Sequence, residues 1–76
     1  MNVNQQIQNL IEVREAIGEK TFRDAAALVY ATYFIKKMIE QRERFNRAKL
    51  LRQVNDSLRE LDCKGVTYSF FRKPIK

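Results

Sequence analysis

The chain has 76 residues and a net charge of +6, with 15 Lys and Arg against 9 Asp and Glu, no histidine and a single cysteine. A chain of this length forms one domain with a modest core, and below roughly 70–80 residues a fold often needs a stabilising crosslink or a partner chain. One cysteine excludes an internal disulfide and indicates a reducing compartment, which we take to be the cytoplasm. Without histidine a zinc site is not expected. We therefore predict no metal and no cofactor, and expect oligomerisation to support the core.

The first predicted helix covers residues 3–17 and is amphipathic. Its apolar stripe consists of Val3, Ile7, Leu10, Ile11, Val13 and Ile17. Gly18 suits the position that follows a helix end. Arg14 projects from near the centre of the apolar stripe. We expect its stem to lie on apolar surface while its guanidinium reaches water or pairs with a carboxylate.

The second predicted helix covers residues 21–43 and carries the only stretch with apolar residues on every side. Thr21 and Asp24 resemble a capping box at its start. One apolar stripe contains Ala27, Leu28, Ala31, Phe34, Ile35, Met38 and Phe45. The opposite side, which turns polar from Lys36 onward, contains Phe22, Ala26, Val29, Tyr30 and Tyr33. A helix that is apolar all round is buried, either in the middle of a small bundle or with one stripe against a second copy of the chain.

The third predicted helix covers residues 47–63. Its apolar face consists of Leu50, Leu51, Val54, Leu58 and Leu61. No Gly or Pro separates it from the second helix, but its apolar face lies roughly 140° round from the earlier stripe. Either the chain breaks near Arg44–Arg47, with Asn46 as the cap, or one long helix shows different faces to different neighbours. We prefer the break.

Residues 64–76 form a basic tail that carries a charge of +4. Gly65 suits the end of the third helix. The segment from Val66 to Phe71 is rich in β-branched and aromatic residues and is predicted as one strand, closed off by Pro74. A lone strand has unpaired backbone groups. It can pair with a second copy, add to a partner's sheet, or lie along the helices as an extended tail.

Together these patterns predict a mainly all-α fold. The helical domain spans residues 1–63 and is a small antiparallel bundle of two to three helices, followed by a C-terminal strand or tail and completed by dimerisation. The apolar run between Arg23 and Lys36 is shorter than the about 20 residues that a membrane span needs. No membrane span is therefore predicted.

The inventory of side chains argues against an enzyme. Without histidine the commonest general base is missing, and two glycines cannot build a phosphate-binding loop. Cys63 lies near a predicted helix C-terminus, where the helix dipole disfavours the thiolate. We predict no catalytic residue and no small-molecule substrate.

Positive and aromatic residues supply the candidate binding sites. The residues predicted to contact nucleic acid or an acidic partner are Arg42, Arg44, Arg47, Lys49, Arg52, Arg72, Lys73 and Lys76. The residues predicted to form a partner interface are Tyr30, Tyr33, Phe34, Met38, Tyr68, Phe70 and Phe71. A turn near Arg44–Arg47 would gather the first five cations into a compact basic corner suited to phosphates or to an acidic surface. A solvated basic surface without a partner is the simpler reading of the same residues.

Three functions fit this pattern. The first is a small basic regulator that binds the nucleic-acid backbone as a helical homodimer. The second is a protein-binding inhibitor or adaptor, of the kind that viruses or mobile elements encode, docked on a larger enzyme or nucleic-acid machine. The third is a subunit with a purely structural role.

Overall fold

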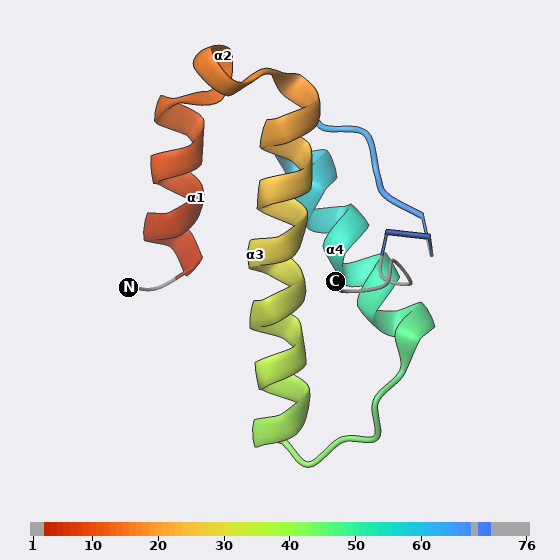
Figure 1. The fold of residues 1–76 in the computed structure, drawn as a ribbon. Helices are drawn as coiled ribbons and strands as arrows, with labels where there is room; N and C mark the ends of the chain where they lie inside the picture. The colour runs from red at the N-terminus through yellow and green to blue at the C-terminus, as the bar shows by residue number, and fades with distance from the viewer. Residues whose placement is uncertain (1–2, 68, 71–76) are drawn as a thin grey trace, which may run out of the picture.

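Four helices are formed by the part of the chain that this computed structural model describes, residues 3–67 and 69–70. They are α1 (Val3–Glu12), α2 (Arg14–Ile17), α3 (Glu19–Glu40) and α4 (Arg47–Glu60). Figure 1 shows the long α3 at the centre, with α1 and α4 beside it and both running in the opposite direction. The mainly helical prediction is confirmed. None of the described helices has the length and apolarity that crossing a membrane requires.

The predicted helix over residues 3–17 is divided at Val13. The Val13 N–H donates to the Leu10 carbonyl at 3.1 Å, which closes a turn tighter than the α-helical one. α2 then forms a single turn in a new direction (Figure 1). Ile7 is buried, but Ile11 and Val13 remain exposed. The apolar stripe predicted for one straight helix is thus only partly covered.

Gly18 joins α2 to α3 with φ 90° and ψ 156°, a conformation that is essentially restricted to glycine. Its N–H donates to the Arg14 carbonyl at 3.0 Å, and its own carbonyl accepts from the Phe22 N–H at 2.9 Å. One residue therefore ends α2 and begins α3. The prediction that Gly18 follows a helix end is confirmed.

The capping box predicted at Thr21 does not form, because α3 already begins at Glu19. Thr21 lies inside the helix and is exposed. Asp24, its expected partner, accepts instead from the side chains of Lys20 at 3.1 Å and Arg23 at 2.9 Å. The Thr21 prediction is wrong because the glycine junction supplies the first helical carbonyl three residues earlier.

Arg14 connects α2 to the neighbouring elements. Its Nε and Nη2 donate to the two carboxylate oxygens of Glu19, the latter at 2.8 Å. Its Nη1 donates at 3.0 Å to the carbonyl of Leu61, just past the end of α4. The guanidinium also lies 4.3 Å from the centroid of the buried Phe22 ring. The predicted pairing with a carboxylate is confirmed, and the same group satisfies a carbonyl at a helix end.

The chain turns back between α3 and α4, so the predicted break is confirmed. α3 ends at Glu40 rather than at residue 43. The Glu43 N–H donates to the Met38 carbonyl at 2.9 Å, and the Arg42 N–H donates to the Ile39 carbonyl at 3.1 Å. Arg42 has φ 58°, the left-handed conformation that this Schellman motif requires and that glycine usually supplies.

α4 begins as predicted and ends earlier than predicted. The side chain of Asn46 accepts from the Lys49 N–H at 3.1 Å, which confirms Asn46 as the cap. The helix stops at Glu60, and Asp62 takes the left-handed position with φ 62°. Gly65, predicted for that position, lies three residues further on. Asp is one of the few residues that visit this conformation readily, so glycine is not needed there.

The strand predicted from Val66 to Phe71 does not form over the residues that the structure describes. Residues 66–67 have no regular structure and residues 69–70 are helical. The Val66 N–H donates to Asn55 Oδ1 at 2.7 Å, and Asn55 Nδ2 donates to the Val66 carbonyl at 3.0 Å. A side chain of α4 thus replaces the bonds that a neighbouring strand would make. Gly65 permits this contact, because a Cβ there would lie 2.9 Å from the Asn55 side chain.

The core lies mainly between α3 and α4. Its fully buried side chains are Phe22, Leu50, Val54 and Leu58. The α3 residues Ala26, Ala27 and Ala31 are also buried, and their small side chains let the neighbouring helices approach closely. The predicted apolar face of α4 is confirmed. Leu28, predicted on a buried stripe, is instead 59% exposed.

We predict that Gly18→Ala lowers the free energy of unfolding by about 1–3 kcal/mol. No heavy atom lies within 4 Å of a Cβ at this position, so the cost comes from the backbone conformation alone. Urea unfolding followed by circular dichroism measures it. Thr21→Ala is the control and should be neutral or stabilise by up to about 0.5 kcal/mol, because alanine favours a helix interior. A loss of about 1 kcal/mol in the control would instead make Thr21 the cap.

A second prediction concerns acid stability. The hydrogen bonds from Arg14 lower the pKa of the Glu19 carboxyl below its ordinary value of 4.5. A group with a lower pKa in the folded state adds stability that is complete above its unfolded pKa and is lost as pH falls through its folded pKa. Glu19→Gln should therefore reduce stability at pH 7 and flatten its decline under acid conditions. Unfolding midpoints between pH 7 and 2 test this. The control is Glu15→Gln, which removes an exposed carboxylate that makes no ion pair with any described residue, and equal effects in both variants would contradict the prediction.

Candidate nucleic-acid interface

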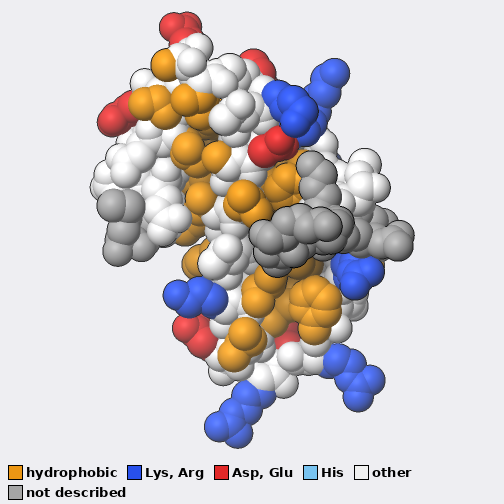
Figure 2. All heavy atoms as spheres, in the orientation of Figure 1, with side chains coloured by type: hydrophobic (Ala, Val, Ile, Leu, Met, Phe, Trp, Pro, Cys, Tyr) orange, Lys and Arg blue, Asp and Glu red, His pale blue; other side chains and the backbone are white. Residues whose placement is uncertain are grey.

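The candidate site is the connection between α3 and α4, residues 41–46, together with Arg47, the first residue of α4; we name these seven residues the basic loop. Arg42, Arg44 and Arg47 are all exposed along it. The turn at the end of α3 and the cap at the start of α4 hold both ends of the loop in place. Figure 2 shows Lys and Arg side chains projecting from this lower end of the molecule, beside exposed hydrophobic atoms.

The charges of the loop are largely uncompensated. Its acidic residue, Glu43, accepts a hydrogen bond from Lys49 Nζ at 2.9 Å. Within the described part of the chain, Arg42, Arg44 and Arg47 make no ion pair. Three guanidinium groups are thus available to an external anion, and guanidinium geometry matches phosphate oxygens well.

Phe45 is the residue of this site that sequence reasoning missed. It was assigned to a buried helical stripe, but the structure places it in the basic loop with its side chain 54% exposed. The predicted break near Arg44–Arg47 already carried the signal, since a residue inside a break leaves the helical stripe. An exposed aromatic ring between arginines offers a surface on which a nucleobase can stack.

The start of α4 adds to the positive potential of the loop. Its first turn contains no acidic residue, and Arg47 is its first residue. The free N–H groups of a helix N-terminus favour anions, and here the capping side chain is the neutral Asn46. The helix dipole and the arginines therefore both make the electrostatic potential at the loop positive.

The remaining predicted cations are placed less favourably or lie outside the described residues. Arg52 is exposed on α4, about one turn beyond the loop, and Lys49 is held by Glu43. The tail cations that lie outside the described residues are Arg72, Lys73 and Lys76. The structure thus gathers three of the eight predicted cations into the basic loop and places two nearby.

Of the residues predicted as a partner interface, the five that the structure describes do not form one exposed surface. Met38 is buried in the core, and Tyr30 and Phe34 are half-buried with their rings stacked at 6.4 Å. Tyr33 is exposed, with its ring edge-on to Phe34 at 5.2 Å. Phe70 packs against the core. Tyr68 and Phe71 lie outside the described residues.

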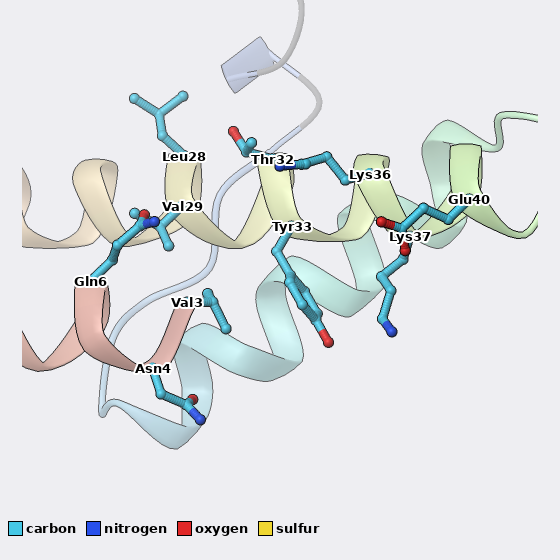
Figure 3. A pocket seen from close by; sticks show the side chains of 10 residues that line it. All are labelled: Val3, Asn4, Gln6, Leu28, Val29, Thr32, Tyr33, Lys36, Lys37 and Glu40. Atoms are coloured by element: carbon cyan, nitrogen blue, oxygen red, sulfur yellow. The ribbon is translucent and has the colours of Figure 1, made fainter. Parts of the chain in front are cut away.

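An open groove of about 620 Å³ runs between the start of α1 and α3. Its lining residues are Val3, Asn4, Gln6, Leu28, Val29, Thr32, Tyr33, Lys36, Lys37 and Glu40. Figure 3 shows Leu28 pointing away from α1 while Val29 lies above Gln6.

The described residues contain no cluster of three potential metal ligands. Burial raises the pKa of the Cys63 thiol, so this cysteine is a weak nucleophile at neutral pH.

Comparisons of the chain with protein-family models, with curated proteins and with solved structures find no match.

We predict that Arg42→Gly raises the free energy of unfolding by about 1 kcal/mol, because glycine relieves the left-handed strain at this position. Arg44→Gly removes the same charge from the same loop at a residue without positive φ. It should destabilise slightly, through the added freedom of the unfolded chain. Urea unfolding of both variants gives the comparison. Equal changes in the free energy of unfolding in the two variants would show that the lost charge, and not the relief of backbone strain, determines the effect.

Proposed function

We propose that this chain is a small non-enzymatic protein that binds the nucleic-acid backbone through its basic loop and acts as a homodimer. The observation that carries the proposal is the exposure, around an exposed Phe45 in one short connection, of three arginines that make no ion pair with any described residue. Arginines supply salt-sensitive phosphate contacts, and the ring supplies stacking that tolerates any base sequence.

The local charge supports a nucleic acid over an acidic protein. Lys49 neutralises the one acid of the loop, so the anion is met by guanidinium groups and by the N-terminus of α4. These donors suit phosphate oxygens that repeat along a backbone. The basic loop also projects beyond the ends of both flanking helices, so an extended polymer can reach it without a fitted pocket (Figure 1).

The test is binding of the full chain to labelled single-stranded and duplex oligonucleotides, measured by fluorescence anisotropy over a range of salt. Arg44→Ala combined with Arg47→Ala should weaken binding and reduce the slope of log K against log salt by about 2 for each basic loop that contacts the duplex. Lys20→Ala combined with Lys64→Ala removes the same charge beside the opposite end of α3 and should leave the slope almost unchanged.

Two outcomes would contradict the proposal. One is the absence of binding by the unmodified chain at low salt. The other is an equal loss in the two double variants, which would mean that net charge alone attracts the oligonucleotide. In that case a nuclease-resistant complex in affinity capture would favour the protein-binding alternative.

A further inference from the structure

The outer face of α3 carries a heptad repeat in which four of the six residues are exposed. Its members, which we name the α3 seam, are Thr21, Ala25, Leu28, Thr32, Ile35 and Ile39. They are spaced alternately by four and three residues over the whole helix, the spacing of the d and a positions in a coiled coil. The repeat covers almost three heptads and contains no charged residue.

This seam lies on the side of α3 opposite the buried residues, with Ile35 packed against the edge of the core and with Leu28 and Thr32 bordering the groove beside α1. On α3, Phe22 and Ala26 are buried on one side, while Ala27 and Ala31 are buried on the other. The seam lies between these sides, on the third face of the helix. Leu28 is 59% and Ile39 69% exposed, Thr21 and Thr32 are exposed, and Ala25 and Ile35 are half-buried. Figure 3 shows Leu28 pointing away from α1.

We propose that the α3 seam pairs with the seam of a second copy of this chain, in antiparallel orientation about a two-fold axis at the level of residue 30. In this register Thr21 faces Ile39 of the second copy. Ala25 likewise faces Ile35, and Leu28 faces Thr32. Each layer joins a smaller side chain to a larger one, so the surfaces fill each other.

Parallel pairing fits the same residues less well. It would place Ala25 against Ala25 and Ile35 against Ile35, which alternates gaps with crowded layers. It would also bring two copies of the basic loop together at one end of the dimer, where like charges repel. The antiparallel register puts the two loops at opposite ends.

The antiparallel dimer has a consequence for binding, which rests on the function proposed above. The two-fold axis is perpendicular to both copies of α3 and to the line that joins them. It therefore places both copies of α4 on the same face of the dimer. Arg42 lies twelve positions from the axis, so the two loops stand about 36 Å apart at 1.5 Å per residue. One turn of duplex DNA spans about 34–36 Å. The dimer therefore presents its two basic loops to one side of a duplex, one turn apart.

Light scattering after size-exclusion chromatography tests the dimer. The unmodified chain should have the mass of a dimer at about 100 μM, and Ile39→Glu should have the mass of a monomer with unchanged helicity. Val13→Glu, at an exposed apolar residue outside the seam, should remain dimeric. A monomeric unmodified chain, or a dimeric Ile39→Glu variant, would overturn the proposal.

Disulfide trapping tests the orientation, with Cys63 replaced by Ser. A mixture of Thr21→Cys and Ile39→Cys chains should crosslink, whereas neither variant should crosslink alone. In the antiparallel dimer two copies of residue 21 stand about 27 Å apart along the helix, far beyond the about 7 Å that a disulfide allows. Crosslinking of Thr21→Cys with itself would show a parallel dimer and overturn the proposal.

DNA length separates this inference from the proposed function. The unmodified chain should bind a duplex of about 20 base pairs about 100-fold more tightly than a hairpin with a stem of about 8, because only the longer site engages both loops. Ile39→Glu should bind the two with similar affinity. Equal affinity of the unmodified chain and Ile39→Glu for the long duplex would overturn the inference and keep the proposed function. An antiparallel dimer that binds neither DNA would overturn the proposed function and keep the dimer.

Discussion

The reversal of the chain between Glu40 and Arg47 is the constraint on which the rest of the structure depends. Helix propensity alone would continue α3 through this region, since it contains neither glycine nor proline. Two local hydrogen-bond patterns prevent that: the Schellman motif around Arg42 ends α3, and the Asn46 side chain begins α4. The reversal lays the apolar face of α4 on α3 and so creates most of the core. It also expels Phe45 from the helical stripe and exposes it among arginines.

Arg14 plays the corresponding part at the other end of the molecule. Its guanidinium joins a carboxylate at the start of α3 to a backbone carbonyl after α4, and its flat face covers the Phe22 ring. Lysine has one charged centre and could not fill these three roles at once. An arginine in the middle of an apolar stripe therefore reflects a junction of three segments that are distant in sequence, and does not interrupt the core.

The sequence predicted those features that depend on residues close together in the chain. The helical content, the cap at Asn46 and the buried face of α4 all follow from local pattern. The two left-handed residues, Arg42 and Asp62, were missed because their strain is tolerated only when the following chain packs back on the helix. The strand predicted from Val66 onward fails because the alternation of side chains shows only that the segment is extended. It does not show whether the backbone groups bond to another strand or, as for Val66, to the side chain of Asn55.

α3 has three apolar faces, whereas the described part of the chain supplies two covering elements, the α1–α2 segment and α4. The two covered faces carry the buried residues Phe22, Ala26, Ala27, Ala31 and Met38. The third carries Leu28, Ile35 and Ile39 at heptad spacing between smaller residues, and the exposure of Leu28 and Ile39 to water is unfavourable for a single chain. The basic loop lies at the end of the same helix. The seam lies on α3 and the loop follows its end, so the two have no residue in common. Changes in the seam therefore alter how many loops reach a ligand, and changes in the loop alter how strongly each loop binds it.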